Sequence, residues 1–250
     1  MKLIKRALIQ DHNRLHLKKL VLLTLSLCLC ACSPGTPFKP ASNFSRDTTV
    51  FDFRLSSFIG SAAIPEYPDA LFVKQAVYGT GFPDTLHVGI PVKGHFTVTS
   101  EIQSVYLITR SDMRRGMLAV FSHAPDNNKF SDKKIGRILG QFVLDEPYLR
   151  LLGAQDINGD GFDELIFLQD AFQMGVQLQS IDIMSIANMQ RTLVAQEQFV
   201  LENSCDSAQH ENVIRASRLE FSPGSIQRDN FVADCVDDDD AAEPFFKLVD

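Results

Sequence analysis

Acidic and amide side chains recur at alternate positions in one short segment, residues 156–165, which read DINGDGFDEL. Asp156, Asn158 and Asp160 hold positions 1, 3 and 5 of this loop, which places hard oxygen ligands on one side of a tight turn. Gly161 at position 6 permits the sharp bend that brings a later ligand round to the same ion. Hard oxygens in a flexible cage favour Ca²⁺ over Mg²⁺, so the segment predicts a calcium loop.

The residues after the loop distinguish two families that share this opening. An EF-hand or a dockerin places a carboxylate at position 12, on a helix, whereas position 12 here is Phe167 inside the apolar run 165–168, which is typical of a strand. The segment therefore resembles the integrin-type FG-GAP or VCBS loop, in which the chain passes from the calcium loop directly into a β-strand. Carried over by position, the resemblance implies that a structural Ca²⁺ is bound by the side chains of Asp156, Asn158, Asp160 and Glu164 and by the carbonyl oxygen of Phe162.

The fourth side-chain ligand is left open by this resemblance. The family more often has Asp at position 9, where this chain has the longer Glu164, and the adjacent Asp163 is an alternative ligand. The resemblance covers only the loop and the strand after it, and a complete seven-bladed integrin-type propeller does not fit in 250 residues. The alternative interpretation of the segment is a β-turn rich in Asn, Asp and Gly that holds no metal.

The first residues have the layout of a secretory signal. Residues 1–19 contain six Lys and Arg against one acid, and residues 20–29 form a short apolar run. A membrane-spanning helix needs about 20 apolar residues, and residues 33–35, Ser-Pro-Gly, end this run too early. The pattern predicts export rather than a transmembrane span.

Residues 29–32, which read LCAC, resemble the bacterial lipobox. The resemblance implies removal of residues 1–31 as a signal peptide, lipidation of Cys32 and stable anchoring, because several acyl chains on one residue exceed the two-signal requirement. Ser33, rather than Asp, comes after the cysteine, which by the enterobacterial sorting rule implies the outer membrane of the bacterial cell envelope. The alternative is an ordinary signal peptide with an incidental cysteine. Residues 32–49, rich in Pro, Ser, Thr and Asn, predict a flexible tether.

The chain after the cleavage position is acidic. Six of the 24 Lys and Arg residues and one of the 31 Asp and Glu residues precede Cys32, so 18 basic residues face 30 acidic ones in the remainder. This charge argues against nucleic acid and anionic lipid head groups as partners and is compatible with divalent cations. Of the five cysteines, only Cys205 and Cys235 come after Cys32. In an exported protein they predict one disulfide, worth roughly 3–4 kcal/mol in the chain-entropy model, with two unpaired thiols as the alternative.

Short apolar or alternating runs separated by turn residues predict an all-β fold, with an antiparallel, propeller-like or sandwich-like domain over residues 50–250. The two cysteines flank a predicted hairpin that turns at residues 222–225, and a short helix is possible near residues 185–190. The expected strands are residues 50–55, 71–77, 86–90, 95–99, 102–109, 117–121, 135–144, 165–168, 176–183, 192–201, 213–221 and 226–232, with a turn at residues 91–94.

Other chemical signals are weaker. His87 and His95 lie among apolar neighbours without a Cys or acid at zinc spacing, so they are interpreted as strand histidines, and the acidic run 237–240 as a solvated tail. The chain has no G-x-S-x-G elbow, no H-E-x-x-H motif and no phosphate-binding glycine loop. We expect a non-catalytic envelope lipoprotein that presents its β domain to another protein or to a glycan. The alternatives are a hydrolase of envelope polymers with a structural calcium, or a lipoprotein subunit of an outer-membrane assembly or transport complex.

Overall fold

Antiparallel strands make up most of the structure, a computed structural model that describes residues 48–55, 58, 66–110, 113–122, 136–146, 148–208, 211–236 and 244–249. The predicted signal peptide 1–31, the lipidation residue Cys32, most of the tether 32–49 and the acidic run 237–240 lie outside these residues. The prediction of an all-β fold is confirmed. Among the described residues, no helix is long and apolar enough to cross a membrane.

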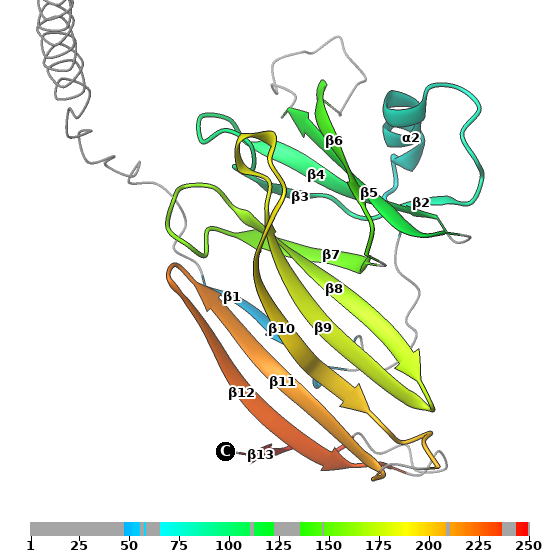
Figure 1. Cartoon of the computed structure of the whole chain (residues 1–250), viewed down its shortest axis with the longest axis vertical. Coiled ribbons are helices and arrows are strands. Elements are labelled where there is room, and N and C mark those ends of the chain that lie inside the picture. The colour runs from blue at the N-terminus through cyan, green and yellow to red at the C-terminus, as the bar shows by residue number, and fades with distance from the viewer. Residues whose placement is uncertain are drawn as a thin grey trace, which may run out of the picture. The chain divides into compact units, whose positions relative to one another are not determined.

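The larger sheet contains eight strands, and seven of them are arranged in chain order (Figure 1). Neighbouring strands are antiparallel throughout, so short turns connect most of them. Strand β1 (Thr49–Asp52) pairs with the half of β11 that β10 leaves unpaired. The strands are β1 (Thr49–Asp52), β7 (Tyr148–Gln155), β8 (Glu164–Gln173), β9 (Val176–Ser185), β10 (Thr192–Asn203), β11 (Val213–Ser222), β12 (Ser225–Asp234) and β13 (Lys247–Val249).

The smaller sheet is built from the segment between β1 and β7. Its order is β2-β4-β5-β6, and β3 pairs with the other half of the β4 edge that β2 occupies. A nine-residue helix, α2 (Ala70–Tyr78), precedes this sheet, and a 3-10 turn, η1 (Ala187–Met189), comes after β9. The strands are β2 (Leu86–Val88), β3 (Val92–Gly94), β4 (Gln103–Arg110), β5 (Met113–Ser122) and β6 (Ile138–Leu144).

The two sheets pack on each other through one shared apolar core. Val105 and Leu118 from the smaller sheet and Leu165 and Phe167 from the larger one belong to the same buried cluster. All four are buried, since alternate side chains of each strand face this cluster, and burying each such side chain stabilises the fold by about 1.5–3 kcal/mol. Strand β8, which follows the predicted calcium loop, therefore lies where the two sheets meet.

Two further clusters complete the fold. On the smaller sheet, Ala70 and Val73 of α2 pack with Tyr106 and Phe121 of β4 and β5. On the larger sheet, a second cluster gathers around Phe53 and includes side chains of β8, β9, β10 and β11. The sheets thus carry buried apolar side chains on more than one face, which explains the near-continuous apolar runs of β4 and β8 in place of strict alternation.

Three expectations differ from the structure. Residues 71–77 form the helix α2 rather than a strand, because Ala70, Val73 and Val77 repeat at helical spacing and pack on one side against the smaller sheet. Residues 95–99 are not a strand, and the preceding expected turn contains β3 instead. Strand β7 is absent from the predicted set, since two register shifts interrupt its pairing with β8 and obscure any alternation.

Candidate functional site

The predicted calcium loop connects β7 to β8, and β8 begins at Glu164. Its polar side chains bond to the backbone of their own loop. Asp156 Oδ1 accepts from the Gly159 amide at 2.8 Å and Oδ2 from the Gly161 amide at 3.0 Å. Asn158 Oδ1 accepts from the Asp160 amide at 2.8 Å. These bonds hold successive oxygen-bearing side chains on the inside of one tight turn.

Glycine is required where the loop reverses. Gly159 and Gly161 have φ angles of 78° and 88°, in the left-handed region that residues other than Gly, Asn and Asp seldom adopt. Between them, Asp160 Oδ1 accepts a hydrogen bond from the Phe162 amide at 2.8 Å. The hydrogen bonds of the turn thus extend to Phe162, whose carbonyl oxygen was predicted as a ligand. The spacing of the two glycines in the sequence thus corresponds to a real backbone constraint.

Glu164 is the buried carboxylate of the loop. Its side chain is fully inaccessible, and its Oε2 accepts from the Ile157 amide at 2.8 Å. The pKa of this carboxyl group is raised from its ordinary 4.5 to about 7, chiefly by burial. The backbone hydrogen bond from Ile157 opposes this rise, and the nearby charges of Asp160 and Asp156 add to it. A carboxylate in this position gains from any cation that replaces its lost hydration.

The Asn158 amide group occupies the space between two of these carboxylates. Its Nδ2 donates to Asp160 Oδ2 at 3.0 Å and to Glu164 Oε1 at 3.1 Å. An amide N–H pair that bonds two carboxylates performs the electrostatic role that a cation would perform there. In the described part of the chain, no three His, Cys, Asp or Glu side chains stand in an arrangement ready to hold a metal ion, so the calcium site stays a prediction.

Asp163, the alternative ligand, points to another part of the molecule. Its Oδ2 accepts from the backbone amide of His95 at 2.7 Å, and its own amide donates to the His95 carbonyl at 2.8 Å. A Cβ atom added to Gly94 would lie 2.5 Å from the same Oδ2, so this approach requires glycine. Asp163 therefore joins the loop to the segment after β3, and Glu164 faces the loop interior.

The loop also contacts the hairpin between β11 and β12. The Ile157 carbonyl accepts from the Gly224 amide at 2.5 Å, and Gly224 lies in the turn predicted at residues 222–225. Beside the loop, Thr49 Oγ1 donates to Gln155 Oε1 at 2.7 Å. The loop thus contacts turns of both sheets, and the end of β7 beside it contacts β1.

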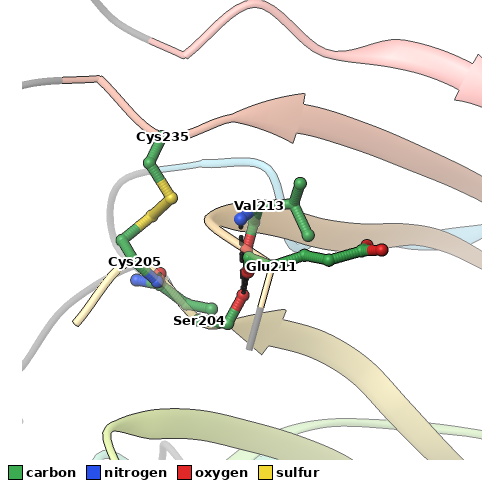
Figure 2. The surroundings of a disulfide bond; sticks show 6 residues. Ser204, Cys205, Glu211, Val213 and Cys235 are labelled. Carbon is green, nitrogen blue, oxygen red and sulfur yellow. Dashed lines mark hydrogen bonds between the residues drawn. A yellow bond between two sulfur atoms is a disulfide. The ribbon is translucent and has the colours of Figure 1, made fainter. Parts of the chain in front are cut away.

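The predicted disulfide is present. Cys205 and Cys235 are bonded, with their Cα atoms 5.6 Å apart, and the bridge joins the segment after β10 to the end of β12 (Figure 2). The adjacent Ser204 is fully buried, and its hydroxyl bonds to the carbonyl oxygens of Glu211 and Val213. The disulfide therefore closes one end of the β10–β11–β12 meander, at the opposite end of β11 from Gly224.

Sequence reasoning missed the partnership of Asp163 with His95. His95 comes after β3 and is not in a strand, whereas His87 lies in β2 as expected. The only sequence signal was indirect, namely a second acid next to the expected ligand. Comparison of the chain with protein-family models, with curated proteins and with solved structures finds no match.

Proposed function

We propose that this chain is a lipid-anchored protein of the bacterial cell envelope whose β domain binds a structural Ca²⁺ in the loop 156–164 and presents its surface to another macromolecule. The observation that carries the calcium part is the fully buried carboxylate of Glu164, which shares the Asn158 amide with Asp160. The anchoring part rests on the lipobox-like residues that end at Cys32.

The loop supports a structural ion for two reasons. Asp156, Asn158, Asp160 and Glu164 are hydrogen-bonded within one short loop, so rotation of their side chains would turn their oxygens toward one ion. For Asn158 the movement is a flip of the amide group, which exchanges its nitrogen for its oxygen. The loop also contacts both sheets, so an ion held there stiffens the junction between them.

The role is structural because protein oxygens would fill most of the coordination shell. Four side chains and one carbonyl leave few positions for a substrate on an ion that takes six to eight oxygen ligands. An exported calcium module needs only modest affinity, about 10⁻⁴–10⁻³ M. At ten times Kd the ion stabilises the fold by about 1.4 kcal/mol.

The test is the melting temperature of the purified domain in millimolar Ca²⁺ and in chelator. Ca²⁺ should raise the melting temperature by a few degrees, with Mg²⁺ having much less effect, because the loop offers a flexible cage rather than an octahedral one. Asp160→Ala should remove the response to Ca²⁺.

The matched control is Asp170→Asn, which removes an exposed carboxylate from the same strand as Glu164. This variant should respond to Ca²⁺ as the unmodified protein does. Equal melting temperatures in Ca²⁺ and in chelator, or an Asp160→Ala variant that still responds, would show that the loop is only a turn.

A further inference from the structure

Met174, in the turn between β8 and β9, and Phe199, in β10, hold backbone conformations that usually belong to glycine, as does Met189 in η1. Met174 has a φ angle of 52° and Phe199 one of 53°. Both side chains are exposed, by 69% and 54%. Left-handed backbone is unfavourable at a bulky residue, and such strain concentrates at binding sites. Apolar side chains this exposed gain little from burial in the fold, so they are available to another molecule.

Met174 and Phe199 line the same pocket. The pocket has a volume of about 400 Å³, within the usual range for binding sites, and its walls are mostly apolar. It lies at the end of β8 and β9 that is remote from the calcium loop, because Glu164 begins β8 and Gln173 ends it. The lining side chains are Gln173, Met174, Val176, Leu178, Phe199 and Glu202.

The position of Phe199 is fixed by a bulge and by one arginine. Between two regular stretches of the β9–β10 ladder, residues 198–200 oppose the single residue Ser180. The guanidinium of Arg228 in β12 donates to the carbonyls of Gln198 and Phe199, both at 3.0 Å. Arg228 therefore holds the bulge in the conformation that turns Phe199 toward the pocket.

The position of Met174 is fixed by the segment that carries the disulfide. Met174 and Gly175 form the two-residue turn between β8 and β9, and both have positive φ, as a type I′ turn requires. A Cβ atom on Gly175 would lie 2.6 Å from the carbonyl oxygen of Asp206, so the turn rests directly on the residues after Cys205. The disulfide thus supports one wall of the pocket.

The charge at the pocket is negative. Glu202 is the charged residue of the lining, and it forms an ion pair with Arg215, which divides its guanidinium between Glu202 at 3.3 Å and Glu211 at 2.8 Å. Two carboxylates thus share one guanidinium, which leaves a net negative charge beside the pocket. The whole chain also has a negative net charge, −7.

We propose that this pocket binds a short segment of a partner protein, which inserts apolar side chains between Met174 and Phe199 and places a Lys or Arg beside Glu202. A volume of about 400 Å³ accepts more than one side chain, and methionine adapts its shape to varied apolar groups. A fatty acid would bind less well, because its carboxylate would repel Glu202. A glycan would also bind less well, because its hydroxyl groups would face a wall that is mostly apolar.

The test uses the peptide Ac-Lys-Leu-Trp-Leu-Lys-NH₂ and its counterpart with Glu in place of Lys. The chain contains no Trp, so Trp emission reports only the peptide, and burial in the pocket shifts that emission to the blue. The lysine peptide should bind at least about tenfold more tightly than the glutamate peptide, which corresponds to about 1.4 kcal/mol. Glu202→Gln should reduce this difference.

Three variants locate the binding site. Phe199→Ala should weaken binding of the lysine peptide at least about tenfold. Phe172→Ala should not, because this side chain of β8 is 70% exposed and lies outside the pocket lining. Met174→Asn should weaken binding and raise the melting temperature, because Asn is favoured at the first position of a type I′ turn. No binding of the lysine peptide, equal affinity for both peptides, tighter binding of laurate, or equal losses in Phe172→Ala and Phe199→Ala would each overturn the proposal.

Discussion

Asp163 and His95, 68 residues apart in the chain, bond to each other in both directions: the Asp163 carboxylate accepts from the His95 amide, and the Asp163 amide donates to the His95 carbonyl. Asp163 lies in the predicted calcium loop of the larger sheet and His95 directly after β3 of the smaller one. Burial raises the pKa of the Asp163 carboxyl group, and the bonds from His95 oppose that rise. The pair is one polar link between two sheets whose shared core is apolar.

The first prediction concerns this link. Asp163→Ala should lower the free energy of unfolding by about 1–3 kcal/mol, because it leaves the His95 amide without its acceptor. Asp163→Asn keeps an acceptor oxygen and should recover most of the loss. Both values are measured by urea unfolding in chelator, so that no metal contributes. Equal losses in the two variants would mean that the hydrogen bond is not what Asp163 provides.

The second prediction concerns Glu164 and pH in the metal-free protein. Its folded pKa of about 7 exceeds the ordinary 4.5, so the folded state binds the proton more tightly than the unfolded state does. The resulting stability is fully present below about pH 4.5 and is lost as pH rises through 7. In chelator, the free energy of unfolding of the unmodified protein, relative to that of Glu164→Gln, should therefore decrease as pH rises from 4.5 to about 7.

Calcium should act against this trend, because it needs the ionised carboxylate. The rise in melting temperature caused by Ca²⁺ should be small near the low end of that range and largest above pH 7. Parallel pH profiles for the unmodified protein and Glu164→Gln in chelator would contradict the burial of an ionisable Glu164.

The third prediction concerns the disulfide. The double variant Cys205→Ser, Cys235→Ser should lose about 2–4 kcal/mol of unfolding free energy, since the bridge restricts the unfolded chain. It should also weaken binding of the lysine peptide, because the turn of Met174 and Gly175 rests on the segment after Cys205. Urea unfolding and the Trp-emission assay measure the two effects. Unchanged peptide binding would show that the disulfide does not support the pocket.

The fourth prediction concerns anchoring. Labelled palmitate should enter the protein when it is made in a bacterial host, and Cys32→Ser should abolish this labelling and release the protein from the membrane fraction. The matched control is Cys30→Ser, which alters the neighbouring cysteine of the lipobox-like segment and should leave labelling intact. Labelling that persists in Cys32→Ser would contradict the lipobox interpretation.

Much of the fold could be predicted because its signals are local. The hairpin of β11 and β12 turns at Pro223 and Gly224 as the turn residues indicate, and counting the cysteines after Cys32 was enough to pair Cys205 with Cys235. Strands β8 and β9 were expected from their apolar patterns. The residues of helix α2 were predicted as a strand because the run is short and largely apolar, so the helical period of 3.6 residues cannot be distinguished in it from the strand period of two.

The sequence by itself determined the composition of the loop: which oxygen-bearing side chains it holds, and where its glycines permit the chain to reverse. Only the tertiary structure decided how Asp163 and Glu164 divide their roles, since that depends on the His95 backbone and on burial between two sheets. The same holds for Met174 and Phe199: the turn of Met174 and Gly175 packs against the backbone of Asp206 after β10, and Arg228 of β12 donates to the Phe199 carbonyl. Local periodicity encodes which face a residue takes, whereas strain and burial arise from groups brought together by long-range pairing.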